Sequence, residues 1–325
     1  MSEYKLCLRH KYEEGLGDYM TRTYESVIAK WMSKKNILFL TGSLAILVIV
    51  ATVLYGYAVL VMTAVSLIAA FLVELMFAKG RKLPWDMAWM IYPLLFVLLV
   101  PANLELKYFW MVAVGSAFGS FFGKGLFGGS GKYVFNPAMV GLLFITVTFP
   151  VHFPTTLLPV TTVGNYSILQ LMLGQAPGTY GETFRLGILI LGVALMVLRV
   201  IDWKLVVSTL GFVFVLAFLG SLLDKGAFPN ATLTLFAGNI LLLSVFVVSD
   251  ETTAPLSARG RVLYGFGIAL ITVLIRYLGG GAQLLGQMEG TVYAIVIMSA
   301  IAPLIDKMFS KSNVKKEVET NEQES

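Results

Sequence analysis

A glycine-rich stretch at residues 128–141, GGSGKYVFNPAMVG, holds the first residues whose types suggest a binding site. Backbone amides of such a loop can approach a phosphate closely, and a lysine adds positive charge. The stretch is not a nucleotide-hydrolysis loop, because Tyr133 follows Lys132 where that motif needs Ser or Thr, and no strand precedes it. Asn136 and Pro137 break a helix here, so freed backbone groups can face a cofactor or an ion. The candidate cofactor contacts are Gly128, Gly129, Lys132 and Asn136.

A second polar stretch, SDETTAPLSARGR at residues 249–261, places two adjacent carboxylates at the edge of an apolar segment. Acidic side chains at this depth are costly unless they are paired or hydrated. One interpretation makes Asp250 and Thr252 ligands for a cation or a cofactor. The other is a helix end that turns at Pro255, followed by arginines that fix topology. We favour the first, because adjacent carboxylates contribute nothing to a positive cytoplasmic bias.

A third stretch, GQAPGTYGETFR at residues 174–185, precedes another apolar segment. Its backbone amides and threonine hydroxyl suit a phosphate or a carboxylate. Its residues equally suit a turn followed by ordinary helix capping. Both interpretations stay open on the sequence alone. The candidate cofactor contacts here are Pro177, Gly178, Gly181, Glu182 and Thr183.

Ionisable residues near the membrane suggest an ion path, since such residues commonly mark the route of a transported ion. The candidates are Asp250, Glu289 and Asp306. For Glu289 and Asp306 the competing explanation is a position at the end of a span, where water hydrates the carboxylate.

Cysteine and histidine usage limits the cofactors. Cys7 is the only cysteine, which excludes a Cys-ligated iron–sulfur cluster in this chain. The two histidines, His10 and His152, do not supply the paired axial ligands of a transmembrane haem. We expect no metal centre and no catalytic residue, and an organic cofactor must carry any electrons.

Hydrophobic segments of membrane-spanning length connect these stretches. The chain is 57% hydrophobic and 13% charged, with a mean hydropathy of +0.80. Because a spanning helix needs about 20 mostly apolar residues, we predict an all-α polytopic membrane protein with about ten helices. Glycines spaced every four residues in the fourth segment favour close helix packing. The predicted spans are 37–55, 58–77, 87–102, 108–123, 137–153, 186–201, 204–222, 231–248, 262–278 and 290–306.

The basic residues fix the expected orientation. Most of the 24 lysines and arginines fall in segments that lie on one side if the N-terminus is cytoplasmic. The outer side keeps only Lys107, Arg185, Lys225 and Arg276. The positive-inside rule then predicts that both termini are cytoplasmic. The net charge of +5 is explained by topology, so it does not indicate nucleic-acid binding.

Two glycine-rich stretches suggest an internal repeat. FGGSGKYVFNPAMVG precedes the fifth span and LGGGAQLLGQMEGTVYA precedes the tenth, on opposite membrane faces. This is typical of a five-plus-five inverted-topology repeat with broken or re-entrant helices. The expected halves of the transmembrane domain (37–307) are about 37–153 and 186–307. Residues 1–36 form a cytoplasmic arm, amphipathic or solvated, and 308–325 a disordered cytoplasmic tail.

Several of these motifs, taken in order, resemble one known family. GGSGKYVFNPAM, PGTYGET, SDETTAP, IRYLGG, EGTVYAI and APLID look like the membrane protein RnfD of the Rnf electron-transport complex. They also look like its homologue NqrB in the sodium-pumping NADH:quinone reductase. The resemblance covers about residues 37–307. It implies a ten-helix inverted repeat in a multi-subunit complex of the bacterial inner membrane, which couples electron transfer to Na⁺ or H⁺ movement.

One departure from that family concerns the flavin. Members carry FMN attached through its phosphate to a threonine in a Ser-Gly-Ala-Thr motif, and this motif is missing here. The corresponding region reads LPVTTVGNYSILQLMLG, with Thr161 and Thr162 as weak substitutes. We therefore expect no covalent flavin by the usual route, and FMN or riboflavin, if bound, to be held non-covalently.

Two functions remain as hypotheses. The first is a non-autonomous subunit of a redox-driven ion translocase that houses a flavin and contributes to an electron or Na⁺/H⁺ path. The second is a channel or secondary transporter for a small solute, because an inverted repeat with broken helices is also typical of transporters.

Overall fold

The protein is an all-α polytopic membrane protein, as predicted. The computed structural model describes residues 21–81, 87–102, 104–153, 167–175, 178–223, 231–236, 238–278 and 290–323. Within these ranges five helices are long and apolar enough to span a membrane, and the remaining apolar helices are shorter. The long ones are α2 (Lys34–Tyr55), α3 (Ala58–Arg81), α10 (Trp203–Leu223), α13 (Ala258–Leu278) and α14 (Gly290–Gln323).

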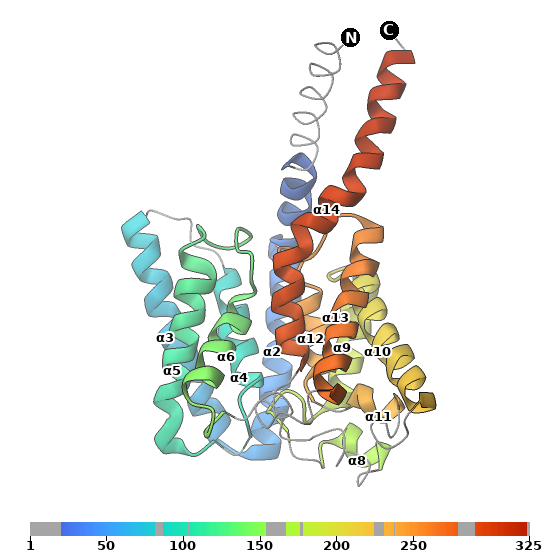
Figure 1. The fold of residues 1–325 in the computed structure, drawn as a ribbon. Coiled ribbons are helices and arrows are strands. Elements are labelled where there is room, and N and C mark those ends of the chain that lie inside the picture. Colours follow the sequence, from blue (N-terminus) through green and yellow to red (C-terminus); the bar gives the residue numbers. More distant parts are fainter. Residues whose placement is uncertain are drawn as a thin grey trace.

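Shorter helices fill the spaces between them (Figure 1). Several predicted spans are divided, because Pro and Gly interrupt the helical ladder. The third predicted span ends as a helix before Pro101, and the eighth is interrupted near Gly238, whose φ of +66° lies in the left-handed region. The shorter elements are η1 (Met87–Met90), α4 (Ile91–Leu98), η2 (Leu106–Tyr108), α5 (Phe109–Phe118), η3 (Gly119–Gly125), α6 (Pro137–Thr148), α8 (Ile168–Leu173), α9 (Arg185–Val197), α11 (Ala231–Phe236), α12 (Ile240–Leu243) and η4 (Ser244–Val248).

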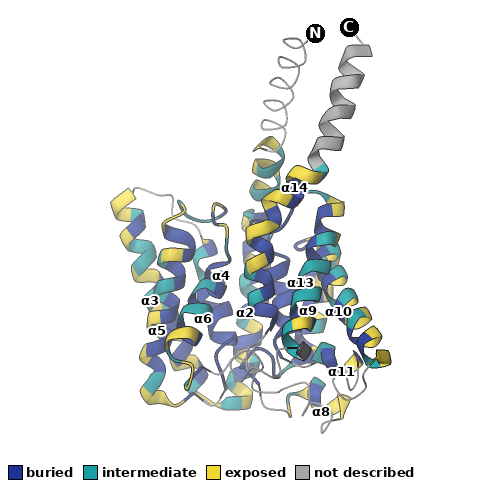
Figure 2. Cartoon of the chain, in the orientation of Figure 1, coloured by how far each residue is buried: buried dark blue, intermediate teal, exposed yellow. Residues whose placement is uncertain are grey.

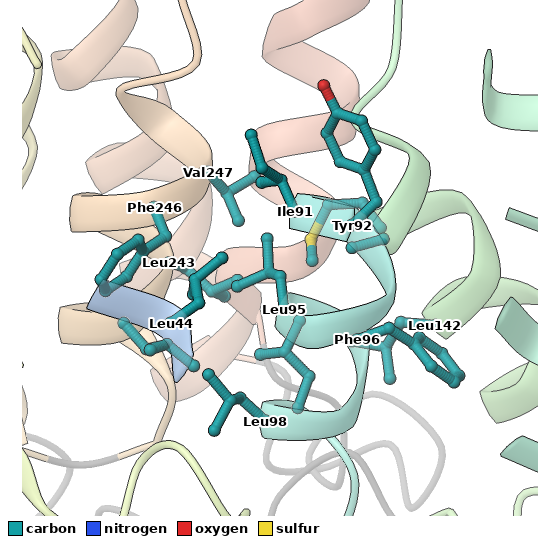
Figure 3. Packing of buried hydrophobic residues seen from close by; sticks show 14 of the residues in the cluster. Leu44, Ile91, Tyr92, Leu95, Phe96, Leu98, Leu142, Leu243, Phe246 and Val247 are labelled. Carbon is teal, nitrogen blue, oxygen red and sulfur yellow. The ribbon is translucent and has the colours of Figure 1, made fainter. Parts of the chain in front are cut away.

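Two of the short elements form the centre of the molecule. Every residue of α4, and every residue of the continuous segment α12–η4, is buried. An element that is apolar on all sides must be surrounded by protein or lipid, and here other helices surround it (Figure 2). Side chains from α4, α6 and α12–η4 interlock in one cluster (Figure 3). The long helices instead leave large apolar side chains exposed on their outer faces, such as Val53 and Leu223, which suits contact with lipid.

Helices at corresponding positions in the two parts of the chain pack against each other in the same pairs. In the first part α3 packs against α5, and α2 packs against α4. In the second part α10 packs against α13, and α9 packs against α12. An inverted repeat requires this correspondence between spans one to five and six to ten. The division into two halves remains a prediction that this order supports.

Glycines in α5, η3 and α6 let these helices touch along their backbones. A Cβ atom added at Gly119 would lie 2.3 Å from the carbonyl oxygen of Pro137, and one at Gly141 would lie 2.4 Å from that of Gly115. Only glycine permits such an approach. The spacing of Gly115, Gly119 and Gly123 therefore serves close packing, as expected.

Replacing Gly119 with alanine is expected to destabilise the folded protein by about 1–3 kcal/mol, because the new methyl group pushes η3 away from α6. The measurement is the thermal unfolding midpoint of the detergent-solubilised protein. Gly42→Ala in α2 is the matched control, since a Cβ there meets nothing within 4 Å. Equal midpoints for the two variants would contradict the packing role.

Candidate functional site

Asp250 is the centre of a buried polar cluster that joins the glycine-rich stretch to the SDETTAP stretch. The hydroxyl of Tyr133 donates to Asp250 Oδ2 at 2.9 Å, and the Asn136 amide donates to the same oxygen at 3.0 Å. The backbone N–H of Thr252 donates to Oδ1 at 3.0 Å. All four residues are buried, with Asp250 only 3% exposed. Residues more than 110 positions apart in sequence thus meet at one carboxylate.

Local hydrogen bonds position the side-chain amide of Asn136 and the backbone amide of Thr252 in the cluster. Asn136 is the N-cap of α6: its Oδ1 accepts from the N–H of Ala138 at 3.0 Å, and Pro137 occupies the first helical position. Because the cap uses the amide oxygen, the amide nitrogen is left to donate to Asp250. On the other side, the turn after η4 is closed by Thr253 and Ala254, whose N–H groups donate to the Asp250 carbonyl at 3.1 Å.

The glycine-rich stretch itself lies over this cluster as a tight loop. Gly128, Gly129 and Gly131 all have positive φ, between 77° and 103°, a region that side chains disfavour. The loop is held by a helix over residues 21–31, from which Tyr24 donates its hydroxyl proton to the Gly131 carbonyl at 2.8 Å. The N-terminal arm is therefore helical over its described part and packs on the loop.

The Asp250 carboxylate is surrounded by hydrogen-bond donors. The three groups directed at the carboxylate are all hydrogen-bond donors, and donors occupy the lone pairs that a hard cation would need. Within the described ranges no group of three or more His, Cys, Asp or Glu side chains is placed to hold a metal ion. The three donated hydrogen bonds stabilise the charged form of this carboxylate.

A cavity of about 360 Å³ lies next to the cluster, below helix 21–31 and beside α14. It brings together three sequence-predicted residues, Lys132, Thr252 and Asp306. The Thr252 hydroxyl oxygen is buried at this wall, without a hydrogen-bond partner of ordinary geometry in the described part of the chain. The full lining is Thr21, Tyr24, Lys132, Tyr133, Val134, Thr252, Thr253, Ala254, Leu256, Ser299, Ala302, Pro303 and Asp306.

Asp306 has a structural partner within this cavity wall. Its Oδ1 accepts from the N–H of Leu256 at 2.8 Å and, at 3.4 Å, from that of Ser257. These are amides just before α13, so the carboxylate of α14 caps that turn from a distance. This cap gives the Asp306 carboxylate a structural role that needs no ion path. Asp306 also lines the cavity, so its place in an ion path stays a prediction.

Residues 178–183 of the PGTYGET stretch lie at the opposite end of the molecule, where α8 and the start of α9 are found (Figure 1). Glu182 pairs with Arg185, Nη2 to Oε1, at 2.6 Å. The Thr183 hydroxyl, which is fully buried, donates to the Thr179 carbonyl at 2.7 Å and lies 2.6 Å from the Tyr55 hydroxyl. Their polar groups bond within the protein, which favours the structural interpretation over a phosphate site.

Glycines in the same segment fit closely against α4. The Gly181 N–H donates to the Leu98 carbonyl at 2.7 Å, and a Cβ at Gly181 would lie 2.8 Å from that of Leu98. The Gly178 carbonyl accepts from Ala102 at 3.2 Å. This segment does not join the Asp250 cluster. Four predicted residues lie outside the described residues: Thr161, Thr162, Pro177 and Glu289.

Sequence reasoning did not select Tyr92, although it belongs to the site. Its hydroxyl lies 2.5 Å from that of Tyr133, at the N-terminal end of α4. It also overlooked three ion pairs of buried basic side chains. Lys124, 2% exposed, contacts both Glu74 oxygens at 3.0 and 3.1 Å, and Arg261 pairs with Asp202 and Glu251. The available signal was a charged residue inside an apolar helix, which Glu74 is.

Comparison with known proteins places these features in a family. A profile of the NQR2, RnfD, RnfE family matches residues 27–315. The B-type subunit of the Na(+)-translocating NADH-quinone reductase of Chromohalobacter salexigens is 28% identical over 267 residues, which is 75% of this chain and 63% of that protein. The same component of the Azotobacter vinelandii enzyme is 29% identical, with 79% and 68% covered. The chain thus spans about two thirds of the length of these relatives.

A relative from a second type of complex matches over more of its length. The D-type subunit of the ion-translocating oxidoreductase complex of Erwinia tasmaniensis is 27% identical over 332 residues, which is 82% of this chain and 92% of that protein. The resemblance inferred from the motifs is confirmed. Since the family profile covers most of the chain, the protein belongs to the NQR2, RnfD, RnfE family.

Proposed function

We propose that this chain is the membrane subunit of a multi-subunit, ion-translocating electron-transport complex of the bacterial inner membrane, with both termini cytoplasmic. The observation that carries the proposal is the buried Asp250 cluster. A carboxylate held by Tyr133, Asn136 and Thr252 inside an apolar helix bundle is costly to bury and is kept where it moves charge. Family membership supports the same function, because the relatives named above are subunits of such complexes.

We infer that the ion route enters through the cavity beside this cluster. The cavity lies on the side where helix 21–31 and the cytoplasmic part of α14 are found (Figure 1). Its lining combines one lysine, one carboxylate and several hydroxyls, all of which can interact with water or an ion. Farther along α4, the apolar cluster of Leu95, Phe96 and Leu142 closes the bundle (Figure 3). A barrier of this kind prevents a passive leak of ions.

A non-covalent flavin is proposed for the same cavity. A volume of about 360 Å³ lies within the size range of small-molecule pockets. Lys132 would hold a phosphate or the polar edge of the ring, and the unpartnered Thr252 hydroxyl would hydrogen-bond to it. A bound flavin supplies one- and two-electron chemistry. The part of the protein is to orient it, to exclude bulk water and to keep Asp250 nearby for protons.

The flavin proposal predicts that acid precipitation of the purified complex releases yellow colour from this subunit into the supernatant. Lys132→Ala combined with Thr252→Val is expected to lower flavin content per subunit by about ten-fold, because each lost polar contact weakens binding. Flavin content is measured by fluorescence, independently of activity. Lys107→Ala, at an exposed surface ion pair, is the control.

Colour that stays in the protein pellet would contradict non-covalent binding. A subunit with no flavin that conducts a small solute in liposomes would favour the transporter hypothesis instead. That alternative shares the fold, so only such a measurement separates the two functions.

A further inference from the structure

We propose that a second cavity, next to the C-terminal half of helix 21–31, binds the phosphate group of a membrane phospholipid. The cavity has a volume of about 300 Å³ and lies between this helix, the start of α2 and the turn that joins α9 to α10. Helix 21–31 stands directly above α2 (Figure 1). This cavity shares no lining residue with the cavity beside Asp250. The proposal does not depend on the proposed function, because it invokes no electron or ion transfer.

The charged side chains of the cavity leave two cations available. Three basic and two acidic side chains line it, so its net charge is positive. Arg261 binds both carboxylates, with Nη1 on Asp202 and Nη2 on Glu251. Lys30 attracts Glu251 but makes no ion pair with it, and Arg199 has no charged partner in the part of the chain that the structure describes. Both cations are exposed, so an anion that enters the cavity can reach them.

Arg199 occupies a backbone position that favours glycine. Within the described ranges it is the only non-glycine residue with a positive φ, at +57°. Its N–H donates to the Met196 carbonyl at 3.0 Å. The N–H of Val200 donates to the Leu195 carbonyl at 2.9 Å, which completes a two-bond cap at the end of α9. Because such a cap favours glycine, the fold does not explain the arginine, whereas an anion in the cavity does.

The cavity lies at a membrane surface. Trp203, the first residue of α10, lines the cavity and is 57% exposed, and α10 is long and apolar enough to span a membrane. Tryptophan at the end of a span typically lies at the level of the lipid headgroups. Val197 and Leu198, directly before Arg199, are also exposed. An apolar surface that faces outward therefore begins beside the basic cavity, which suits a ligand with a phosphate and acyl chains.

The apolar part of the lining favours a phospholipid over a free phosphate ion. Val27, Met196 and Val200 line the same cavity as the basic residues. A hydrated phosphate ion would leave these side chains in water, whereas the glycerol and upper acyl chains of a lipid remove them from water. The proposed topology places this end of the bundle at the cytoplasmic leaflet. Anionic lipids gather in that leaflet, and basic pockets between helices there bind lipid headgroups.

A lipid in this cavity would connect two parts of the chain. Lys30 belongs to the N-terminal helix and Arg199 to the turn between α9 and α10, so a phosphate held by both joins them. Glu251, which follows Asp250 in the turn after η4, lines the same cavity. A ligand that binds only the folded protein raises its stability. We therefore expect phospholipid to raise the unfolding temperature.

The test uses the complete complex, purified in detergent, depleted of lipid and supplied with phosphatidylglycerol in detergent micelles. Bound lipid per complex is counted by native mass spectrometry, and the unfolding midpoint is measured with and without lipid. Lys30→Gln combined with Arg199→Gly is expected to weaken the binding of one phosphatidylglycerol by about ten-fold or more, because both charged contacts to the phosphate are lost. The rise in the midpoint caused by lipid should shrink with it.

Lys204→Gln is the matched control, because it removes a cation at the start of α10 that does not line the cavity. A double variant that binds phosphatidylglycerol as tightly as this control would overturn the site. If inorganic phosphate alone raises the midpoint as much as phosphatidylglycerol does, the ligand is free phosphate and the lipid assignment is wrong.

Arg199→Gly alone separates the role of the charge from a structural role. Glycine suits this backbone position, so without lipid the variant should unfold at or above the wild-type temperature. With lipid its midpoint should rise less than that of the wild type. A lower midpoint without lipid, or failure of this variant to assemble, would show that the side chain supports the fold and would overturn the proposal.

Discussion

Arg185→Met is expected to remove most of the folded protein from the membrane. The guanidinium, 1% exposed, donates to Glu182 at 2.6 Å, to the Phe236 carbonyl at 2.7 Å and to the Leu171 carbonyl at 3.2 Å. Its loss leaves the buried Glu182 carboxylate without this cation and two carbonyls without this donor. Breaking such a pair costs about 3–5 kcal/mol, a large part of the stability of a typical domain.

The double variant Glu182→Gln with Arg185→Met separates the effect of the ion pair from that of the carbonyl contacts. It removes both charges, so stability should recover by a large fraction of the loss in the single variant. Both proteins are compared by their yield in membranes and by size-exclusion chromatography after heating. A double variant as unstable as the single one would mean that the carbonyl contacts, and not the ion pair, hold this end of the molecule together.

Asp250→Asn is expected to impair ion coupling strongly while the complex still assembles. The asparagine oxygen can accept from Thr252, but its NH₂ group then faces the donating amide of Asn136. One unsatisfied buried donor costs about 1–3 kcal/mol, which weakens the fold without preventing it. The side chain can no longer take up a proton, so ion movement per electron should fall by about ten-fold or more.

Ion movement and electron transfer are measured together in liposomes, with assembly checked on native gels. Glu105→Gln removes an equal charge from an exposed pair with Lys107 and serves as the control. Coupling in Asp250→Asn that equals this control would remove Asp250 from the ion path. Loss of assembly in Asp250→Asn alone would make the cluster a purely structural joint.

The sequence predicted the long helices and their class well, because length and hydropathy decide whether a segment can span a membrane. It could not tell which apolar segments contact lipid and which form the core. IYPLLFVL of α4 reads like any span, yet every one of its residues is buried. Lipid tails and leucine side chains are equally apolar. The composition of a helix therefore does not show whether lipid or other helices surround it.

The site was predicted in pieces. Asn136 and Asp250 were both selected, since a helix break and an acidic residue at a span end are local signals. Their bond joins positions 114 apart and has no local signal. Tyr133 excludes a nucleotide loop by its position after Lys132, but nothing in the sequence indicated that it donates to Asp250. The sequence also did not predict that Asp306 caps the turn at Leu256, because this contact depends on how α14 packs.

The bond between Asp306 and Leu256 gives α14 a mechanical role. The helix runs unbroken from Gly290 to Gln323, 34 residues, which at about 1.5 Å per residue makes a rod of about 50 Å. Pro303, one turn before the bond, removes a backbone hydrogen bond and makes the rod easiest to bend there. A sideways pull on the C-terminal end of this helix therefore acts as a lever with its pivot at the wall of the cavity, and Asp306 passes the movement to the Leu256–Ser257 turn before α13.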